Sequence, residues 1–352
     1  MLRLEVEHKV ISDPVIDAIR AWLATDWEVA HVCILSRTEV GTASITLNEV
    51  AYPSRGRFLL YSITKTIMAV AALRLVQEGS LDLDQNLASW LPEFSPAREF
   101  SLRQILQHTS GLPDYYGLKQ YHDAVRQGGA PWTEDEFLAR TEASRLRSPP
   151  GSAFAYSNIG YMLVRRVLVR ATGEDFAVLL HRVVFVPLGI EDATVPTTKA
   201  ELSGLTFGLS RYLGGDGEPV DVRQRYDPGW IATGVVGTSI VSAARFLHAL
   251  FSGALLNQEL LGEMSKGRAV PLEGDAGGLW QQSEYGLGLM MDVDNDGGRF
   301  FGHRGAGPGC SPAVFHFPNK KKPLTVCVIT NSENPDQPVA MIKAVAATFP
   351  NS

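Results

Sequence analysis

The sequence predicts an α/β (α+β) fold in which both ends of the chain build one sheet domain and an all-helical domain is inserted between them. β-rich runs occur near the N-terminus and again toward the C-terminus, whereas the middle of the chain shows helical periods broken by proline and glycine. We therefore assign residues 1–80 and 206–352 to a domain with an antiparallel sheet flanked by terminal helices, and residues 81–205 to the helical domain. A cleft at the junction of the two domains is the expected ligand site.

The N-terminal segment is expected to hold one helix and one hairpin. Asp13 followed by Pro14 is typical of a helix start, because aspartate caps the first turn and proline fits the first helical position. Apolar residues then recur on one face: Val15, Ile19, Trp22 and Leu23. The β-rich runs 31–35 and 43–47 flank a turn near 38–41, which predicts an antiparallel hairpin.

The later elements follow from the same periodicities. A long apolar run after the hairpin predicts a helix over Ile63–Gln77. Further helices are expected in the inserted domain and after Trp230, at 102–107, 133–141, 159–171, 238–255 and 339–349. Strands are expected at 286–293, 299–302, 313–318 and Leu324–Thr330. The terminal helices should cover one face of the sheet.

The composition is that of a folded globular protein without a face for nucleic acid or membrane. Of the 352 residues, 45% are hydrophobic and 20% are charged; the net charge is −6, and basic residues are scattered except for the run 320–322. The N-terminus lacks the features of a secretory signal, and the longest apolar run, 67–76, is too short to span a membrane. A cytoplasmic location is therefore expected. The three cysteines lack metal or redox spacing and are expected to be reduced core thiols.

The pair Ser62 and Lys65 points to acyl-transfer chemistry, although Ser-x-x-Lys is expected by chance about once in a chain of this length. Ser62 is the only serine with a lysine three residues later, and on a helix these positions share one face. A serine hydroxyl is a poor nucleophile until a base takes its proton, and a buried lysine with a lowered pKa can be that base. Backbone N–H groups at the helix start can stabilise an oxyanion.

A second motif, Tyr156-Ser-Asn158, lies at a predicted boundary between a loop and a helix. Tyr156, deprotonated or hydrogen-bonded to Lys65, could transfer the proton between nucleophile and leaving group. Asn158 could hold Lys65 or a substrate amide, or it could simply cap the helix. Taken alone, this motif favours the structural interpretation.

A third motif, His303-Arg304-Gly305-Ala306-Gly307, follows a predicted strand. Glycine here would let a substrate backbone lie close against an edge strand, and the Ala306 N–H could be an oxyanion donor beside that of Ser62. The motif is not placed between a strand and a helix, as a dinucleotide or phosphate loop requires, so phosphate binding is not expected.

Together, in this order, the three motifs resemble those of the serine β-lactamase and penicillin-binding protein superfamily, and most closely its class C β-lactamase-like branch. That branch includes D-alanyl-D-alanine carboxypeptidases, D-amino-acid amidases and peptidases, and carboxylesterases. The resemblance extends to the segments 102–113, 150–158 and 285–288. It implies that Ser62 is the acylated nucleophile, Lys65 its base partner and Tyr156 a second proton-transfer group, with Asn158 orienting Lys65 and substrate.

The resemblance also implies two oxyanion donors, the N–H groups of Ser62 and Ala306, and places His303 where β-lactamases carry a lysine. Because histidine has a reference pKa of about 6.5, it would weaken the field on a substrate carboxylate at neutral pH. This departure fits carboxypeptidase, amidase and esterase relatives better than efficient β-lactamases. Arg304 stands where threonine is frequent, and it would either grip a substrate carboxylate or point into solvent.

The function expected from the sequence is a serine hydrolase that cleaves an ester or amide through a Ser62 acyl-enzyme. A β-lactamase-family carboxylesterase or a D-amino-acid-type amidase or peptidase is favoured. The alternative within enzymes is a penicillin-binding D,D-carboxypeptidase with weak β-lactamase activity, and the alternative of another class is a non-catalytic binding or self-assembling scaffold. The expected partners are small ester, amide or short peptide substrates, and no oligomeric state is predicted.

No cofactor and no metal are expected. The segment 292–297 matches the first half of a calcium loop, but its twelfth position is His303 rather than glutamate, so an acidic hairpin turn is expected instead. His108 lies in a Thr-Ser-Gly turn that ends a helix and is expected to satisfy buried backbone groups rather than to act in catalysis.

Overall fold

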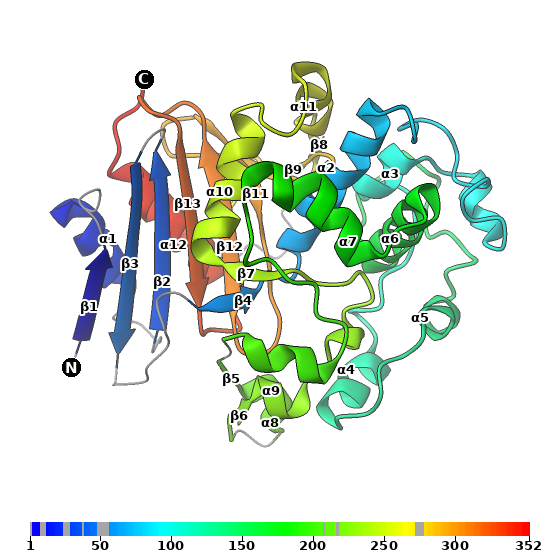
Figure 1. The fold of residues 1–352 in the computed structure, drawn as a ribbon, viewed down its shortest axis with the longest axis horizontal. Coiled ribbons are helices and arrows are strands. Elements are labelled where there is room, and N and C mark those ends of the chain that lie inside the picture. Colours follow the sequence, from blue (N-terminus) through cyan, green and yellow to red (C-terminus); the bar gives the residue numbers. More distant parts are fainter. Residues whose placement is uncertain are drawn as a thin grey trace.

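A nine-stranded antiparallel sheet forms the centre of the computed structural model (Figure 1), in the order β1-β3-β2-β13-β12-β11-β10-β9-β8. The structure describes residues 2–7, 12–23, 29–36, 39–47, 56–206, 208–215, 218–271 and 278–352. The strands are β1 Leu2–Glu7, β2 Val29–Ser36, β3 Glu39–Leu47, β8 Arg268–Ala269, β9 Glu284–Tyr285, β10 Met290–Val293, β11 Arg299–Arg304, β12 Ser311–Phe317 and β13 Leu324–Thr330. The predicted fold class is confirmed.

The two ends of the chain meet at the pairing of β2 with β13, where Cys33 lies opposite Cys327. The predicted hairpin is confirmed as β2 and β3, which pair from Val29 to Ser36. Residue 38 of the predicted turn lies outside the described residues, and residues 39–41, which were also assigned to the turn, belong to β3. Strand β1, which pairs with β3, was not predicted. The three cysteines are free and buried, as expected.

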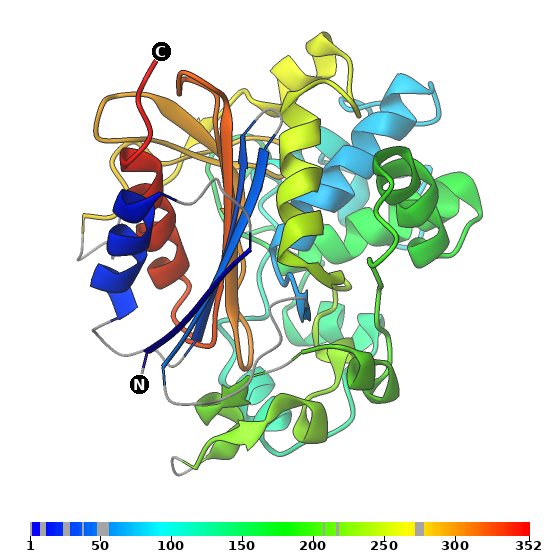
Figure 2. The same ribbon diagram turned by 60° about the vertical axis from the view of Figure 1, so that its left-hand side comes forward.

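Helices cover both faces of the sheet, as Figure 2 shows. On one face lie α1 (Asp13–Leu23) and α12 (Asp336–Ala347), whose buried residues pack with those of the central strands in one apolar core. On the other face lies α10 (Ile240–Phe251), with α2 (Ile63–Gln77) behind it. Because both faces are covered, β12 and β13 are buried along their whole length, which explains their nearly continuous apolar sequences.

The middle of the chain is helical between α2 and residue 204, as predicted. Its helices are η1 Ser95–Arg98, α3 Leu102–Leu106, α4 Lys119–Arg126, α5 Glu134–Arg140, α6 Asn158–Thr172, α7 Phe176–Leu180, η2 His181–Phe185, η3 Val186–Leu188 and η4 Lys199–Gly204. Ser101 and Thr133 cap α3 and α5 through capping boxes, and α6 ends at Gly173 with φ +70°. None of the helices in the described ranges combines the length and apolarity needed to cross a bilayer. The division at 80/81 and 205/206 stays a prediction.

Two predicted elements need correction. The helix expected at 238–255 starts at Ile240, because Gly237–Ser239 form β7 and pair with β4 (Arg57–Leu59). The strand expected at 286–293 begins only at Met290, where β10 starts, because residues 286–289 form the turn between β9 and β10, in which Gly288 has φ +71° and Gly286 donates its N–H to the Leu289 carbonyl. The remaining elements are β5 Leu209–Ser210, α8 Arg211–Gly214, β6 Val220–Asp221, α9 Val222–Arg225, η5 Pro228–Trp230 and α11 Gln258–Met264.

The acidic segment 292–297 covers the end of β10 and, from Asp294 on, the hairpin turn to β11, so the predicted acidic hairpin turn is confirmed. Asp294 accepts the backbone N–H groups of Asp296 and Gly298 within the turn. Asp292 is buried and accepts the N–H groups of Gln281 and Gln282. These carboxylates therefore shape the backbone at this end of the sheet.

The packing of α12 on the sheet gives a stability prediction. Ile342 is fully buried, so Ile342→Ala should lower the free energy of unfolding by about 2–4 kcal/mol through lost apolar contacts and the cavity left behind. Val178 of α7 is 55% exposed, and Val178→Ala should change the free energy of unfolding by less than about 0.5 kcal/mol. Urea denaturation of both variants measures the difference; equal effects would contradict the described core.

Candidate active site

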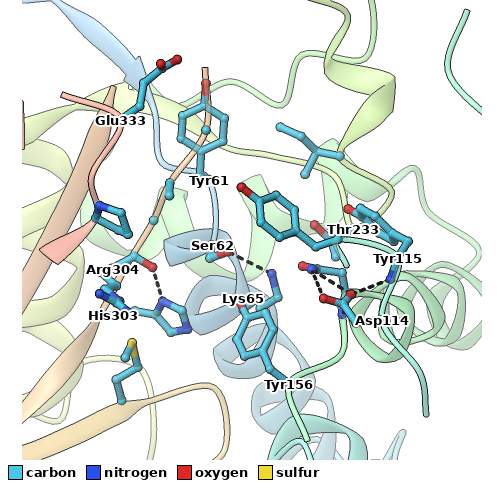
Figure 3. Close-up of a pocket in the computed structure, with 18 of the residues that line it drawn as sticks. Tyr61, Ser62, Lys65, Asp114, Tyr115, Tyr156, Thr233, His303, Arg304 and Glu333 are labelled. Atoms are coloured by element: carbon cyan, nitrogen blue, oxygen red, sulfur yellow. Dashed lines mark hydrogen bonds between the residues drawn. The ribbon is translucent and has the colours of Figure 1, made fainter. Parts of the chain in front are cut away.

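A cavity of about 570 Å³ opens where α2 begins, between the sheet and the helical part of the chain (Figure 3). Its walls bring together all eight residues singled out from the sequence: Ser62, Lys65, Tyr156, Asn158, His303, Arg304, Gly305 and Ala306. Aromatic side chains make up much of the remaining wall, which is more apolar than polar.

Ser62 and Lys65 lie at the first turn of α2, in the geometry predicted from their spacing. Ser62 is the residue that precedes the helix, and its Oγ lies 3.1 Å from the Lys65 Nζ. Lys65 is 2% exposed, and burial lowers its pKa from 10.5 to about 7, an effect that the negative charge of Asp114 partly opposes. No carboxylate in the described part of the chain forms a salt bridge with it. Near neutral pH a large fraction of Lys65 is therefore unprotonated.

The backbone around Ser62 is held by close packing against the end of β11. Tyr61 has φ +44°, an uncommon value for a residue with a side chain, and its hydroxyl donates to the Pro308 carbonyl at 2.7 Å. A Cβ on Gly305 would lie 2.5 Å from the Leu60 carbonyl oxygen, and a Cβ on Gly307 would lie 2.1 Å from the Tyr61 ring. The glycines of the third motif are thus needed for the approach of this segment to the serine loop.

Asp114, which the sequence interpretation missed, fixes Asn158. Its carboxylate accepts both the backbone N–H of Asn158, at 2.9 Å, and the side-chain amide, at 3.0 Å. The Asn158 amide nitrogen is therefore already engaged, which leaves its oxygen as the group able to face Lys65 or a substrate N–H. The motif-like segment recognised in the sequence ends at Pro113, one residue before this carboxylate.

Tyr156 lies beside Lys65, whose Nζ is 5.1 Å from the centre of the tyrosine ring. Burial raises the pKa of the phenol, and an interaction with the Ser62 hydroxyl acts in the opposite sense. Burial therefore favours the protonated phenol, so of the two expected forms of Tyr156 the deprotonated one is disfavoured in the resting protein.

His108 packs against the Tyr156 ring, with the ring centres 4.2 Å apart, and its Nδ1 accepts the Ser157 N–H. Burial lowers the pKa of this imidazole well below its ordinary value. As expected from the sequence, His108 thus satisfies a buried backbone group, here at the start of α6.

His303 is a neutral imidazole in this site. It is 2% exposed, and burial lowers its pKa to about 3. Its Nδ1 lies 2.6 Å from the Arg304 carbonyl oxygen, which can only accept, so Nδ1 carries the proton. Its Nε2 must then accept from the Tyr285 hydroxyl, 2.9 Å away. The weak cation expected at this position is therefore replaced by an uncharged ring held by Tyr285.

Arg304 directs its charge toward the α12 side of the sheet. Its guanidinium forms an ion pair with Asp336 at the start of α12 and lies 5.4 Å from the centre of the Trp280 ring. The sequence left two interpretations of Arg304: a residue that grips a substrate carboxylate, or a residue that points into solvent. The structure supports neither, because the guanidinium is paired with Asp336. Its side chain is 28% exposed and already paired.

The segment that carries Ala306 is not on an edge strand, which corrects the expectation from the sequence. Strand β11 lies between β10 and β12, but its pairing with β10 ends at Gly302. Residues 303–306 consequently border the cavity. No residue of the described ranges accepts a hydrogen bond from the N–H of Ser62 or of Ala306.

Comparison with known proteins agrees with this fold. The model of the β-lactamase family matches residues 36–348 of the chain, and the chain belongs to this family of serine hydrolases. Penicillin-binding protein 4* of Bacillus subtilis (strain 168) is 24% identical over 303 residues, covering 82% of this chain and 63% of that protein. Esterase EstB of Burkholderia gladioli is 33% identical over 210 residues, covering 55% of this chain and 50% of that protein.

Solved structures give the same family of folds. A D-stereospecific amidohydrolase from Streptomyces sp. superposes with a TM-score of 0.81 at 25% identity, covering 95% of this chain and 97% of that one. A D-amino acid amidase from Ochrobactrum anthropi SV3 superposes with a TM-score of 0.82 at 21% identity, covering 96% and 98% of the two chains. The chain spans between half and about two thirds of the curated relatives' length, but nearly all of these two structures.

The burial of Lys65 gives a prediction about stability and pH. Lys65→Met should raise the free energy of unfolding by a few kcal/mol below pH 7, because the folded wild type must then carry a buried charge. Since the folded pKa of about 7 is below the unfolded value, the wild type gains stability as pH rises. The advantage of the variant should therefore shrink between pH 7 and about 10.4. Urea denaturation at several pH values tests this, and an advantage independent of pH would contradict it.

Proposed function

We propose that this protein is a serine hydrolase that cleaves an ester or amide bond through an acyl-enzyme on Ser62. The favoured activities are those of a carboxylesterase or a D-amino-acid-type amidase or peptidase. The observation that carries the proposal is the contact of 3.1 Å between the Ser62 hydroxyl and a buried lysine whose pKa is lowered to about 7. Such a lysine can take the serine proton at neutral pH, which an exposed lysine cannot do.

In acylation, the Ser62 Oγ forms a bond to the substrate carbonyl carbon while its proton passes to the neutral Lys65 amine. The carbonyl oxygen gains the negative charge, and the N–H groups of Ser62 and Ala306 would stabilise it. The protonated phenol of Tyr156 would give its proton to the leaving alcohol or amine and regain one from Lys65. In deacylation, the same groups would remove a proton from water, which attacks the acyl carbon and releases Ser62.

The charges of the cavity favour substrates without a carboxylate. His303 is neutral, and Arg304 is paired with Asp336. The D,D-carboxypeptidase alternative needs a cation for the terminal carboxylate of its substrate, and neither residue offers an uncommitted one. Relatives named esterase and D-aminopeptidase are consistent with the proposed cleavage of an ester or amide. A relative named penicillin-binding protein is consistent with the D,D-carboxypeptidase alternative.

The nucleophile can be tested directly by covalent labelling. A fluorophosphonate should add one adduct to the wild type, located at Ser62 by peptide mass spectrometry, and p-nitrophenyl butyrate should be hydrolysed. Ser62→Ala should lose both the adduct and at least about 99.9% of the turnover. The exposed Ser80 gives a matched control, since Ser80→Ala should keep both. A wild type that neither labels nor hydrolyses would support the scaffold alternative instead.

The pH dependence of turnover tests the role of Lys65. Because the neutral amine is the base, kcat/KM for an uncharged ester should rise about tenfold per pH unit below 7 and level off above it. His303, which also lines the cavity, cannot produce this rise in kcat/KM, because burial lowers its pKa to about 3. After subtraction of spontaneous hydrolysis, a profile that is flat from pH 5 to 8 would exclude Lys65 as the base.

A further inference from the structure

A second carboxylate borders the cavity, at the end opposite Asp114. Glu333 lies in the connection between β13 and α12, and Figure 3 places it beyond the Tyr61 ring as seen from Ser62. Its Oε1 accepts the Ser210 hydroxyl at 2.5 Å and the Gly309 N–H at 3.0 Å, and its Oε2 accepts the Tyr212 N–H at 3.2 Å. These contacts fix the carboxylate and leave acceptor capacity on Oε2.

Glu333 has no cationic partner within the part of the chain that the structure describes. Arg126, close to Tyr212, pairs with Asp123, and Arg304 of the cavity wall pairs with Asp336. Arg126 also lies over the Tyr212 ring, 5.9 Å from its centre. A half-buried carboxylate that lines an active-site cavity without a paired cation creates a negative field there.

Three tyrosines line the cavity together with this carboxylate. Tyr61, Tyr116 and Tyr212 line the same cavity as Glu333; the Tyr212 N–H donates to its carboxylate, and the Tyr212 hydroxyl and the Tyr116 ring both contact His122. Tyr116 is 55% exposed and lines the opening of the cavity. Electron-rich aromatic faces beside a carboxylate are the arrangement that attracts ammonium groups.

Resting on the proposed hydrolase function, we propose that the preferred substrates carry a cationic ammonium group, which Glu333 and the rings of Tyr61, Tyr116 and Tyr212 bind. The Tyr61 side chain separates Ser62 from Glu333, and its hydroxyl contacts Pro308, next to the glycine that donates to Glu333. The ammonium group would therefore lie on the far side of the Tyr61 ring from the Ser62 hydroxyl. An α-amino group, one carbon from the carbonyl, does not reach it.

Matched esters that differ in one charge test the proposal. Butyrylcholine is compared with 3,3-dimethylbutyl butyrate, its uncharged carbon analogue, for a cation on the leaving group. The p-nitrophenyl esters of 6-aminohexanoate and heptanoate are compared for a cation on the acyl group. In the wild type at least one cationic ester should exceed its neutral partner in kcat/KM by about tenfold or more.

The readout is the ratio of kcat/KM for the cationic over the neutral ester, because a general loss of activity cancels in it. Glu333→Gln should bring the ratio to about one, and Tyr116→Leu should lower it about twofold to fivefold. Glu259→Gln, which removes the same charge from an exposed position of α11 outside the cavity, should leave it unchanged. Because Tyr116 is 55% exposed, Tyr116→Leu is expected to fold, so the ratio of kcat/KM values can be measured even if Glu333→Gln does not fold.

The outcomes separate this inference from the function beneath it. Neutral esters hydrolysed by the wild type but not by Ser62→Ala, with no preference for either cationic ester, would overturn the ammonium site and leave the hydrolase proposal intact. A preference that survives in both Glu333→Gln and Tyr116→Leu would also overturn it. No Ser62-dependent hydrolysis of any of the four esters would overturn the hydrolase function itself.

Discussion

The rest of the site depends on the burial of Lys65 at the start of α2. A lysine in an apolar environment loses its proton readily, but only if the structure keeps water and carboxylates away from it. Helix α2 supplies the apolar surroundings, since 12 of its residues are buried, and Asp114, the carboxylate that acts on Lys65, forms no salt bridge with it and only partly opposes the lowering of its pKa. The turn at Gly288 closes on the same helix, where a Cβ would lie 2.5 Å from that of Ala69. The proton affinity of Lys65 is therefore a property of the packing around the whole helix.

The electrostatic character of the cavity follows from how its other ionisable groups are held. Tyr285 and a backbone carbonyl keep His303 neutral, and Asp336 holds the charge of Arg304. Asp114 and Glu333 are both held by hydrogen bonds, and neither forms an ion pair among the described wall residues. These commitments are the basis of the proposed preference for neutral or positively charged substrates over acidic ones.

Local sequence was sufficient where a feature depends on neighbouring residues. The bounds of α2 and β13 were predicted to the residue, and the spacing of Ser62 and Lys65 gave their contact. Features that depend on distant segments were missed. Asp114 meets Asn158 across 44 positions, and the tautomer of His303 is set partly by Tyr285, 18 positions away. The predicted strand 286–293 also missed the turn before β10, in which Gly288 packs closely against Ala69 of α2.

Different parts of this fold hold the proposed reacting groups and form the wall of the cavity. Ser62, Lys65 and Tyr156 sit where helices begin or strands end, positions that the packing of α2 and α6 fixes. Much of the cavity wall instead comes from connections, such as Tyr116 before α4 and Glu333 before α12. A connection can change without disturbing the core, so proteins of one family can share the serine and lysine yet differ in substrate. Substrate preference must accordingly be argued from wall residues such as Glu333, because the three motifs leave it open.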